Sequence, residues 1–183
     1  MEVLLNDSSV LLNLLAADCL ASIASATGWQ FAICPAVRDE VKRLRDAQTG
    51  EMIEVDVTPH IVSGLLQVLE LSGEEEQMLY VEQSIVVDDG EAMSIAIAAH
   101  RQLALAIDDK QAANHTHRKF PEIRLWSTPE ILKHWAEVGY VDAKVLCEAI
   151  RLIETRARYF PAQSHALADW WRQSKEGRVL KSL

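Results

Sequence analysis

Positive charge is scarce in the middle of this sequence. No Lys or Arg occurs between Arg45 and Arg101, whereas twelve Asp or Glu residues do. The 183 residues carry a formal charge of −9, which argues against non-specific binding to nucleic acids. Two interpretations of this surplus stay open. It can be a solvated acidic face, which is common, or a set of carboxylates that binds a cation.

Cysteines are also few. The three cysteines, Cys19, Cys34 and Cys147, are odd in number and show no CxxC spacing, which argues against disulfides and against zinc ligands. We expect buried, reduced thiols.

The chain lacks a basic leader and a long apolar run. The N-terminus MEVLLND has an acid where a signal peptide carries positive charge, so we expect a cytoplasmic protein. The longest uncharged window, residues 19–37, contains Gly28 and Pro35 and therefore predicts a helix, a turn and a strand instead of a membrane span. No membrane partner is expected.

Apolar strands alternate with helices along the chain. Strands are predicted at residues 3–6, 30–34, 103–107 and 123–126, and helices at 10–17, 19–26, 72–83, 92–100 and 129–139. The segment AVRDEVKRLRD predicts a helix, because Val37, Val41 and Leu44 share one face. KQAANHTHRKF predicts a polar, basic helix, and EMIEVDV and LLQVLEL predict an edge strand or hairpin arm and a further strand. This alternation predicts an α/β fold with a parallel sheet covered by helices on both faces.

The sequence predicts one domain over residues 1–141 and a helical extension over residues 142–183 that packs on it. The extension differs in charge, with eight Lys or Arg against five Asp or Glu. Two helices are expected in it, at residues 143–159 and 164–175, separated by Phe160-Pro161.

Acidic residues stand at the ends of the predicted strands and the starts of the predicted helices. Asp7 and Asp108-Asp109 follow strands, and Glu40 and Glu91 lie in first turns of helices. Ligands of parallel sheets bind outside the carboxyl ends of the strands, so these carboxylates are expected to converge there. Their mutual repulsion is removed by a divalent cation, and ligation by oxygen alone favours Mg²⁺ or Mn²⁺. Such a site suits phosphodiester hydrolysis.

Each of these acids has an ordinary explanation when it is taken alone. Asp7 can cap a helix, Glu40 can be an exposed charge, Glu91 can complement a helix dipole, and Asp108-Asp109 can form a turn. Only their joint order along the chain favours the metal site.

Several polar side chains are weaker candidates for contact with a substrate. They are Ser8, Ser9, Lys110, His115, His117, Arg118 and Lys119, with a second basic group at Arg38, Lys42, Arg43 and Arg45. Capping by the serines and a solvated helix face for the basic residues are the alternatives. Trp170-Trp171 can stack on a base or pack against protein.

Five segments, in this order and spacing, resemble the PIN-domain nucleases, including the VapC-like ribonucleases of toxin–antitoxin pairs. They are the strand end at Asp7-Ser8-Ser9-Val10, CPAVRDEV with Glu40, DDGEAMSIAIAAH with Glu91, LALAIDDK with Asp108-Asp109, and LWSTPEILKHWAEVGYV. The resemblance implies a three-layer α/β/α sandwich and an endoribonuclease dependent on Mg²⁺ or Mn²⁺. It places the metal on Asp7, Glu40, Glu91 and Asp109, with Asp108 as a neighbour that substitutes or assists. It also implies RNA as substrate and an antitoxin protein as partner.

Two other functions stay open at this point. One is a catalytically silent PIN-fold binding or regulatory module, and the other is a hydrolase of small phosphate esters. A homodimer is expected, because the apolar helix at residues 10–17 and the tail with Trp170-Trp171 offer possible dimer faces.

Overall fold

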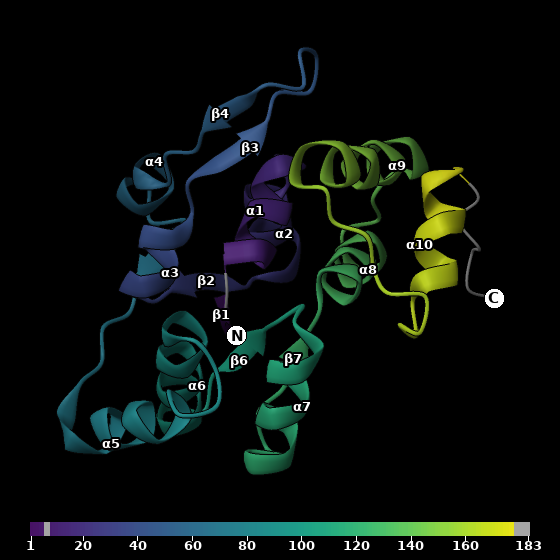
Figure 1. Ribbon diagram of the computed structural model, residues 1–183. Coiled ribbons are helices and arrows are strands. Elements are labelled where there is room, and N and C mark those ends of the chain that lie inside the picture. The colour runs from purple at the N-terminus through teal and green to yellow at the C-terminus, as the bar shows by residue number, and fades with distance from the viewer. Residues whose placement is uncertain (6–7, 178–183) are drawn as a thin grey trace. The chain divides into compact units, whose positions relative to one another are not determined.

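The computed structural model describes residues 1–5 and 8–177, and these residues form two compact units (Figure 1). The sheet unit consists of residues 1–11, 29–42 and 55–127. The helical unit consists of residues 12–28 and 43–54 and of the chain from residue 128 onward. Helix α1 (Ser8–Ala16) begins in the sheet unit and ends in the helical unit.

A five-stranded parallel sheet forms the centre of the sheet unit. Its strands lie in the order β5 (Leu66–Val68), β2 (Gln30–Ile33), β1 (Glu2–Leu5), β6 (Ala104–Ala106) and β7 (Leu125–Trp126). Val3 of β1 stands opposite Phe31 on one side and Ala104 on the other, and both Val3 and Phe31 are fully buried. Strands β2 and β5 lie on one side of β1, and β6 and β7 lie on the other. The strand order therefore reverses between β1 and β6. The predicted α/β fold with a parallel sheet is confirmed.

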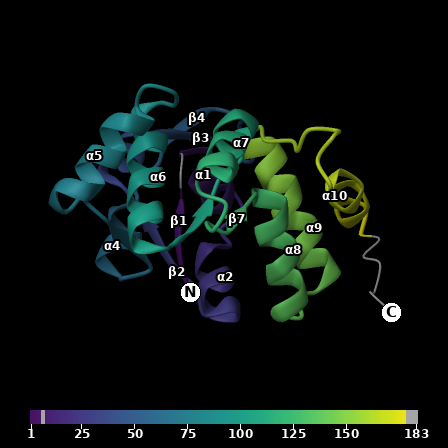
Figure 2. The same ribbon diagram turned by 90° about the horizontal axis from the view of Figure 1, so that it is seen from below.

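Five helices of the sheet unit lie between its strands along the chain. They are α3 (Pro35–Glu40), α4 (Thr58–Val62), α5 (Gly73–Gln83), α6 (Asp89–Arg101) and α7 (Lys110–Lys119). Helix α6 lies along β1 and β6 and beside α5 (Figures 1 and 2). The small residues Ala92, Ala96 and Ala98 let it approach the sheet closely, and all three are fully buried.

The predicted helix AVRDEVKRLRD is wrong beyond Glu40. Val41 has extended dihedral angles, and strand β3 (Arg43–Arg45) pairs antiparallel with β4 (Met52–Glu54), which confirms EMIEVDV as a hairpin arm. In β3, Leu44 is buried between the exposed Arg43 and Arg45. This Arg-Leu-Arg alternation also fits the two-residue period of a strand. Pairing with β4 favours the strand over the helix at these residues.

The helical unit contains α2 (Leu20–Thr27), α8 (Thr128–Val138), α9 (Ala143–Leu152) and α10 (Ala168–Lys175). Figure 2 shows α2 beside α8, and α9 beside α10. The indole nitrogen of Trp135 donates to the Ser22 hydroxyl at 3.2 Å and ties α8 to α2. The predicted helix at 143–159 is α9 followed by a π-helical turn, η1 (Ile153–Ala157), which ends at Arg158 in the left-handed conformation.

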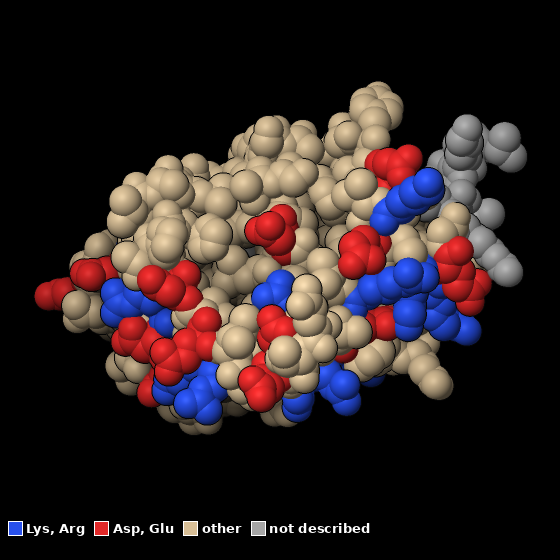
Figure 3. Space-filling view, turned by 90° about the horizontal axis from the view of Figure 1, so that it is seen from above, with Lys and Arg blue, Asp and Glu red and all other residues tan. Residues whose placement is uncertain are grey.

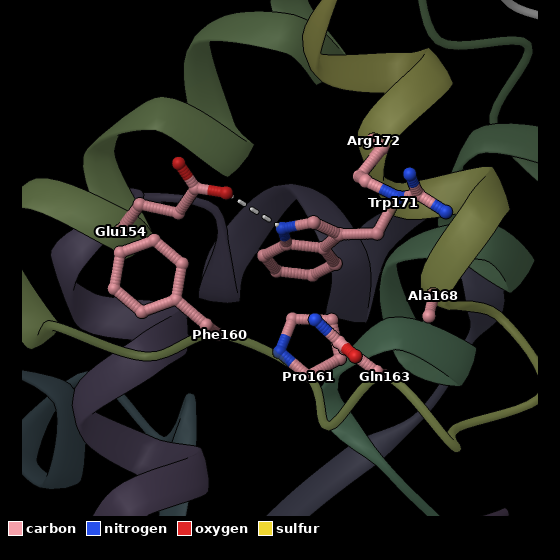
Figure 4. Close-up of a pocket in the computed structure, with 7 residues that line it drawn as sticks. All are labelled: Glu154, Phe160, Pro161, Gln163, Ala168, Trp171 and Arg172. Carbon is pink, nitrogen blue, oxygen red and sulfur yellow. Dashed lines mark hydrogen bonds between the residues drawn. The ribbon is translucent and has the colours of Figure 1, made fainter.

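The second tryptophan of the tail packs inside the helical unit. Trp171 is 2% exposed, its indole nitrogen donates to Glu154 Oε1 at 3.0 Å, and its ring forms a T-shaped pair with the ring of Tyr159. Lys175 pairs with the other oxygen of Glu154. Glu154 and Trp171 border a cavity of about 480 Å³, onto which the ring of Phe160 also faces (Figure 4). Trp171 therefore serves packing and does not present a free face for stacking on a base.

Two of the three cysteines are buried, and none is in a disulfide. Burial raises the pKa of the Cys19 thiol to about 12 and also raises that of Cys34, so both stay protonated. No single described helix is long and apolar enough to cross a membrane. The pair α1 and α2, bent by 97°, meets the criteria of length and composition, as buried core helices and N-terminal signal sequences also do.

Candidate functional site

A cavity of about 460 Å³ lies in the sheet unit. Its lining residues come from the start of α1, the end of α3, and the starts of α6 and α7 with the residues that precede them. Its lining residues are Ser8, Ser9, Glu40, Val86, Val87, Asp88, Glu91, Asp109, Gln111 and Ala112. The serines follow β1 and Asp109 follows β6, the two strands at which the strand order reverses. This is the place where an open parallel sheet is expected to bind a ligand. We call it the carboxylate cavity.

The N-terminus of α6 fixes Glu91 in this cavity. Asp88 is the N-cap of the helix, and its Oδ1 accepts a hydrogen bond from the Glu91 backbone N–H at 2.9 Å. Glu91 is only 8% exposed, so its carboxylate is held among protein atoms. Asp88 is not among the residues predicted from the sequence for this site. The signal for it was present, because Asp before a helix start is a typical N-cap.

Glu40 reaches the same cavity from the end of α3. It is the last residue of that six-residue helix, not a first-turn residue as predicted. A Cβ atom on Gly90 would lie 3.0 Å from Glu40 Oε1, so the missing side chain of Gly90 makes room for the carboxylate. Cys34 holds the two helices together, because its Sγ lies 3.7 Å from the Gly90 carbonyl and accepts from the Ser94 hydroxyl at 3.4 Å.

Of the two adjacent aspartates after β6, Asp109 lines the cavity, whereas Asp108 is not among its lining residues. Asp109 is the N-cap of α7, and its Oδ1 accepts from the Ala112 backbone N–H at 2.8 Å. Its Oδ2 makes no hydrogen bond with the residues that the structure describes. The cap thus orients the side chain and leaves one oxygen for a ligand.

Asp7, the first predicted metal ligand, lies outside the described residues. Ser8 and Ser9, which come next in the sequence, line the cavity. Within residues 1–5 and 8–177, no group of three or more His, Cys, Asp or Glu side chains is gathered closely enough to hold a metal ion. The oxygen-only donor set fits Mg²⁺ or Mn²⁺ in its chemistry. The described carboxylates share one cavity without forming a closed ligand shell.

A second cavity of about 570 Å³ adjoins the first, since Asp109 and Gln111 line both. Its other lining residues are Lys110, Asn114, His117 and Arg118. Lys110 and Arg118 were predicted to contact substrate, and the structure places both on this second cavity.

Two other members of the predicted basic patch are engaged elsewhere. The His115 Nε2 atom lies 2.9 Å from Gln83 Oε1, and Lys119 pairs with Glu82 at 2.8 Å. Burial lowers the pKa of His115, and the charges of Lys119 and Arg118 lower it further.

The second basic group is divided between several interactions. Arg38 pairs with Asp39 at 2.8 Å and holds the pKa of that carboxyl below its ordinary value. Arg45 donates to the Gly50 carbonyl at 3.1 Å within the β3–β4 hairpin. Neither residue lines the carboxylate cavity. Figure 3 shows acidic and basic side chains on the same face, so that face carries charges of both signs.

The apolar surfaces that suggested a dimer are used inside the chain. Val10, Leu11 and Leu14 of α1 are fully buried, as is nearly all of Trp171. The homodimer stays a prediction, but these buried side chains are not available to form its interface.

A family model described as a PIN domain matches residues 3–167. The match includes Glu40, Glu91 and Asp109, and it extends past residue 141 into the segment predicted as a helical extension. No curated protein matches the chain. No solved structure matches it either.

Proposed function

Because the chain belongs to the PIN-domain family, we propose that it is a divalent-metal-dependent endoribonuclease that hydrolyses phosphodiester bonds of RNA. PIN domains are generally metal-dependent nucleases. One observation carries the proposal: Glu40, Glu91 and Asp109, from three distant segments, line one cavity beside the strands where the sheet order reverses. Three carboxylates that share a cavity repel one another unless a cation binds there.

In this proposal Asp7, Glu40, Glu91 and Asp109 hold Mg²⁺ or Mn²⁺. The bound cation supplies neutralisation of the phosphate charge and a water of lowered pKa. The chain contributes orientation. The caps formed by Asp88 and Asp109 fix the starts of α6 and α7, so Glu91 and Asp109 are presented without reorganisation of the backbone.

The serine hydroxyls on the cavity have a separate role in the proposal. Ser8 and Ser9 lie at the start of α1, where backbone N–H groups and hydroxyls together favour an anion. We propose that they orient the scissile phosphate against the carboxylates. The exposed Val86 also lines the cavity and contributes an apolar wall.

The direct test is cleavage of a mixed set of RNAs by the purified chain with Mn²⁺, followed on denaturing gels. Wild-type protein is expected to cleave, and EDTA is expected to abolish the activity. Glu91→Gln and Asp7→Asn are expected to lower the rate on the order of 100-fold, because each removes charge from the metal site. Glu74→Gln, an exposed acid on α5, is the matched control. Unchanged cleavage by Glu91→Gln would contradict the proposal.

A second candidate function is a catalytically silent module of the same fold. The observation in its favour is that the described carboxylates form no closed ligand shell. Titration calorimetry with Mn²⁺ separates the two. Heat of binding that disappears in Glu91→Gln supports the nuclease, and no heat with wild-type protein supports the silent module.

We further propose that the chain is the toxin of a toxin–antitoxin pair, on the resemblance of its motifs to the VapC-like group. Induced expression of the wild-type chain in a bacterial host is then expected to arrest growth, and Glu91→Gln is expected to be harmless. Equal growth with both proteins at equal abundance would contradict the toxin assignment.

A further inference from the structure

Helix α7 carries two cations, Lys110 and Arg118, that differ from other cations of the sheet unit in their partners. Arg101 pairs with Glu76 at 2.6 Å and Lys119 with Glu82 at 2.8 Å. Among the described residues, Lys110 and Arg118 form no ion pair. In a chain of charge −9, cations that are free of carboxylates are available for an anion from outside.

These two cations lie on one face of α7. Lys110, Asn114 and Arg118 follow each other at intervals of four residues, which brings them to one side of the helix over about 12 Å. The Arg118 Nε donates to the Asn114 carbonyl at 3.2 Å, so the guanidinium is anchored on its own helix and not on a carboxylate. The opposite side of α7 is used for packing, with Ala112 and Thr116 buried.

The cavity along this face continues the carboxylate cavity. Both share Asp109 and Gln111, so a chain that leaves the first cavity past Asp109 enters the second. Apart from Asp109, every residue that lines the second cavity carries a nitrogen that can donate a hydrogen bond: Lys110, Gln111, Asn114, His117 and Arg118. Donors of this kind bind phosphate and sugar oxygens.

We infer that this face of α7, Lys110 with Gln111, Asn114, His117 and Arg118, binds the phosphate backbone of a single-stranded RNA next to the position of cleavage. The inference rests on the proposed nuclease function and adds to it the site that holds the strand. The lining contains no Phe, Tyr or Trp side chain, and its donors are those that bind phosphate and sugar oxygens. Binding at α7 is therefore expected to depend little on the base sequence of the RNA.

This site resolves a difficulty that the acidic composition creates. A polyanion is repelled by a protein of net charge −9, and the carboxylate cavity adds to that repulsion. Lys110 and Arg118, on the cavity that Asp109 also lines, attract the strand locally and place it along the carboxylates. Affinity is then expected to depend on salt, with a slope of about 0.7 in log affinity against log salt for each phosphate contact.

The test measures binding separately from cleavage. A short fluorescent single-stranded RNA of mixed sequence is titrated with the full chain in EDTA and followed by fluorescence anisotropy at several salt concentrations. The double variant Lys110→Ala with Arg118→Ala is expected to bind at least about tenfold more weakly at low salt, and its salt slope is expected to fall by about 1.4 for two lost contacts. The charge-conserving double variant Lys110→Arg with Arg118→Lys is expected to keep most of the affinity.

The matched control removes the same charge from helices that do not line either cavity. Lys133 and Arg151 lie on α8 and α9, and their double alanine variant is expected to bind as the wild type does. Equal weakening by both double alanine variants would overturn the inference, as would wild-type protein that binds no RNA. Wild-type protein that binds through α7 but never cleaves with Mn²⁺ would leave the binding site standing and refute the proposed nuclease.

Discussion

Asp109 shows how one side chain can serve both folding and a site. One oxygen caps α7 by accepting from Ala112, and the residue also lines the carboxylate cavity. A capping oxygen needs only a lone pair, whereas a cation needs the negative charge, so the two roles respond differently to substitution.

This difference gives the first prediction. Asp109→Asn keeps the cap, because Asn and Asp are equally good N-caps, and is expected to change the free energy of unfolding little. Asp109→Ala removes the cap and is expected to destabilise the protein by about 1 kcal/mol. Both are expected to lose RNA cleavage. Chemical denaturation and the Mn²⁺ assay check this, and an active Asp109→Asn would exclude the residue as a metal ligand.

Glu76 has a structural role away from the cavity. Its carboxylate is fully buried and accepts from Arg101 Nε at 2.6 Å and Arg101 Nη2 at 2.8 Å, while His100 lies at 3.0 Å. It also accepts from the Ser72 backbone N–H at 2.7 Å, which caps α5 from within the helix. The hydrogen bonds from Arg101 outweigh burial and lower the pKa of Glu76 from 4.5 to about 2.

The sign of this shift sets the second prediction. A carboxyl with a lowered pKa stabilises the folded state above its ordinary pKa, and this contribution is lost as the pH falls from about 4.5 to about 2. The shift corresponds to roughly 3 kcal/mol. Glu76→Gln is therefore expected to destabilise the protein at pH 6 and to differ less from wild type near pH 3, in urea denaturation. Glu74→Gln, exposed on the same helix, is the control, and a difference independent of pH would contradict the assignment.

At the scale of elements, the approach of α3 to α6 depends on a missing side chain. Gly90 is in the first turn of α6 and does not have a positive φ. Its role is therefore space for Glu40 and not backbone freedom.

The third prediction follows from that approach. In Gly90→Ala the new Cβ meets Glu40 Oε1 at 3.0 Å, so the carboxylate has to move, whereas helix propensity improves by up to about 1 kcal/mol. Stability is expected to hold or rise, while Mn²⁺ affinity and RNA cleavage fall. Calorimetry and denaturation on the same preparations check it. Loss of stability with unchanged Mn²⁺ affinity would show that Glu40 does not bind the cation.

The segment after Glu40 shows the limit of periodicity at this scale. Val37, Val41 and Leu44 have helical spacing, yet the helix ends at Glu40 and a hairpin follows. A short stretch of alternating Arg and Leu satisfies both periods. Its partner strand, in which Ile53 pairs with Leu44 nine residues earlier, is invisible to local propensity.

At the scale of the whole molecule, the proposed metal site links stability to the concentration of a cation. A ligand that binds only the folded state stabilises it by about 2.7 kcal/mol at 100 times its Kd. For a chain of this length, that corresponds to a rise in Tm of roughly 5–10 °C.

The fourth prediction uses this linkage. Wild-type Tm is expected to rise with Mn²⁺, and Glu91→Gln is expected to lose most of the rise while remaining folded without metal. Differential scanning calorimetry in a series of Mn²⁺ concentrations measures both. An equal rise in the two proteins would mean that the cation binds outside the carboxylate cavity.

The sequence by itself determined the α/β class, the parallel sheet, the family and the positions of most elements. Buried parallel strands and amphipathic helices leave distinct local periods, and N-caps and glycines mark their ends. The order of the acidic motifs along the chain was likewise visible. Their convergence could be predicted, because the carboxyl ends of parallel strands meet at one edge of the sheet.

Only the tertiary structure decided which neighbouring side chains share a cavity. It placed Asp109 and not Asp108 on the carboxylate cavity. It also added Asp88 to the cavity lining and showed that Gly90 makes room for Glu40. On α7 it distinguished Lys110 and Arg118, which line the second cavity, from Lys119, which pairs with Glu82. These distinctions depend on side-chain direction and on partners far apart in sequence. Neither is encoded in spacing along the chain, because both follow from packing between elements.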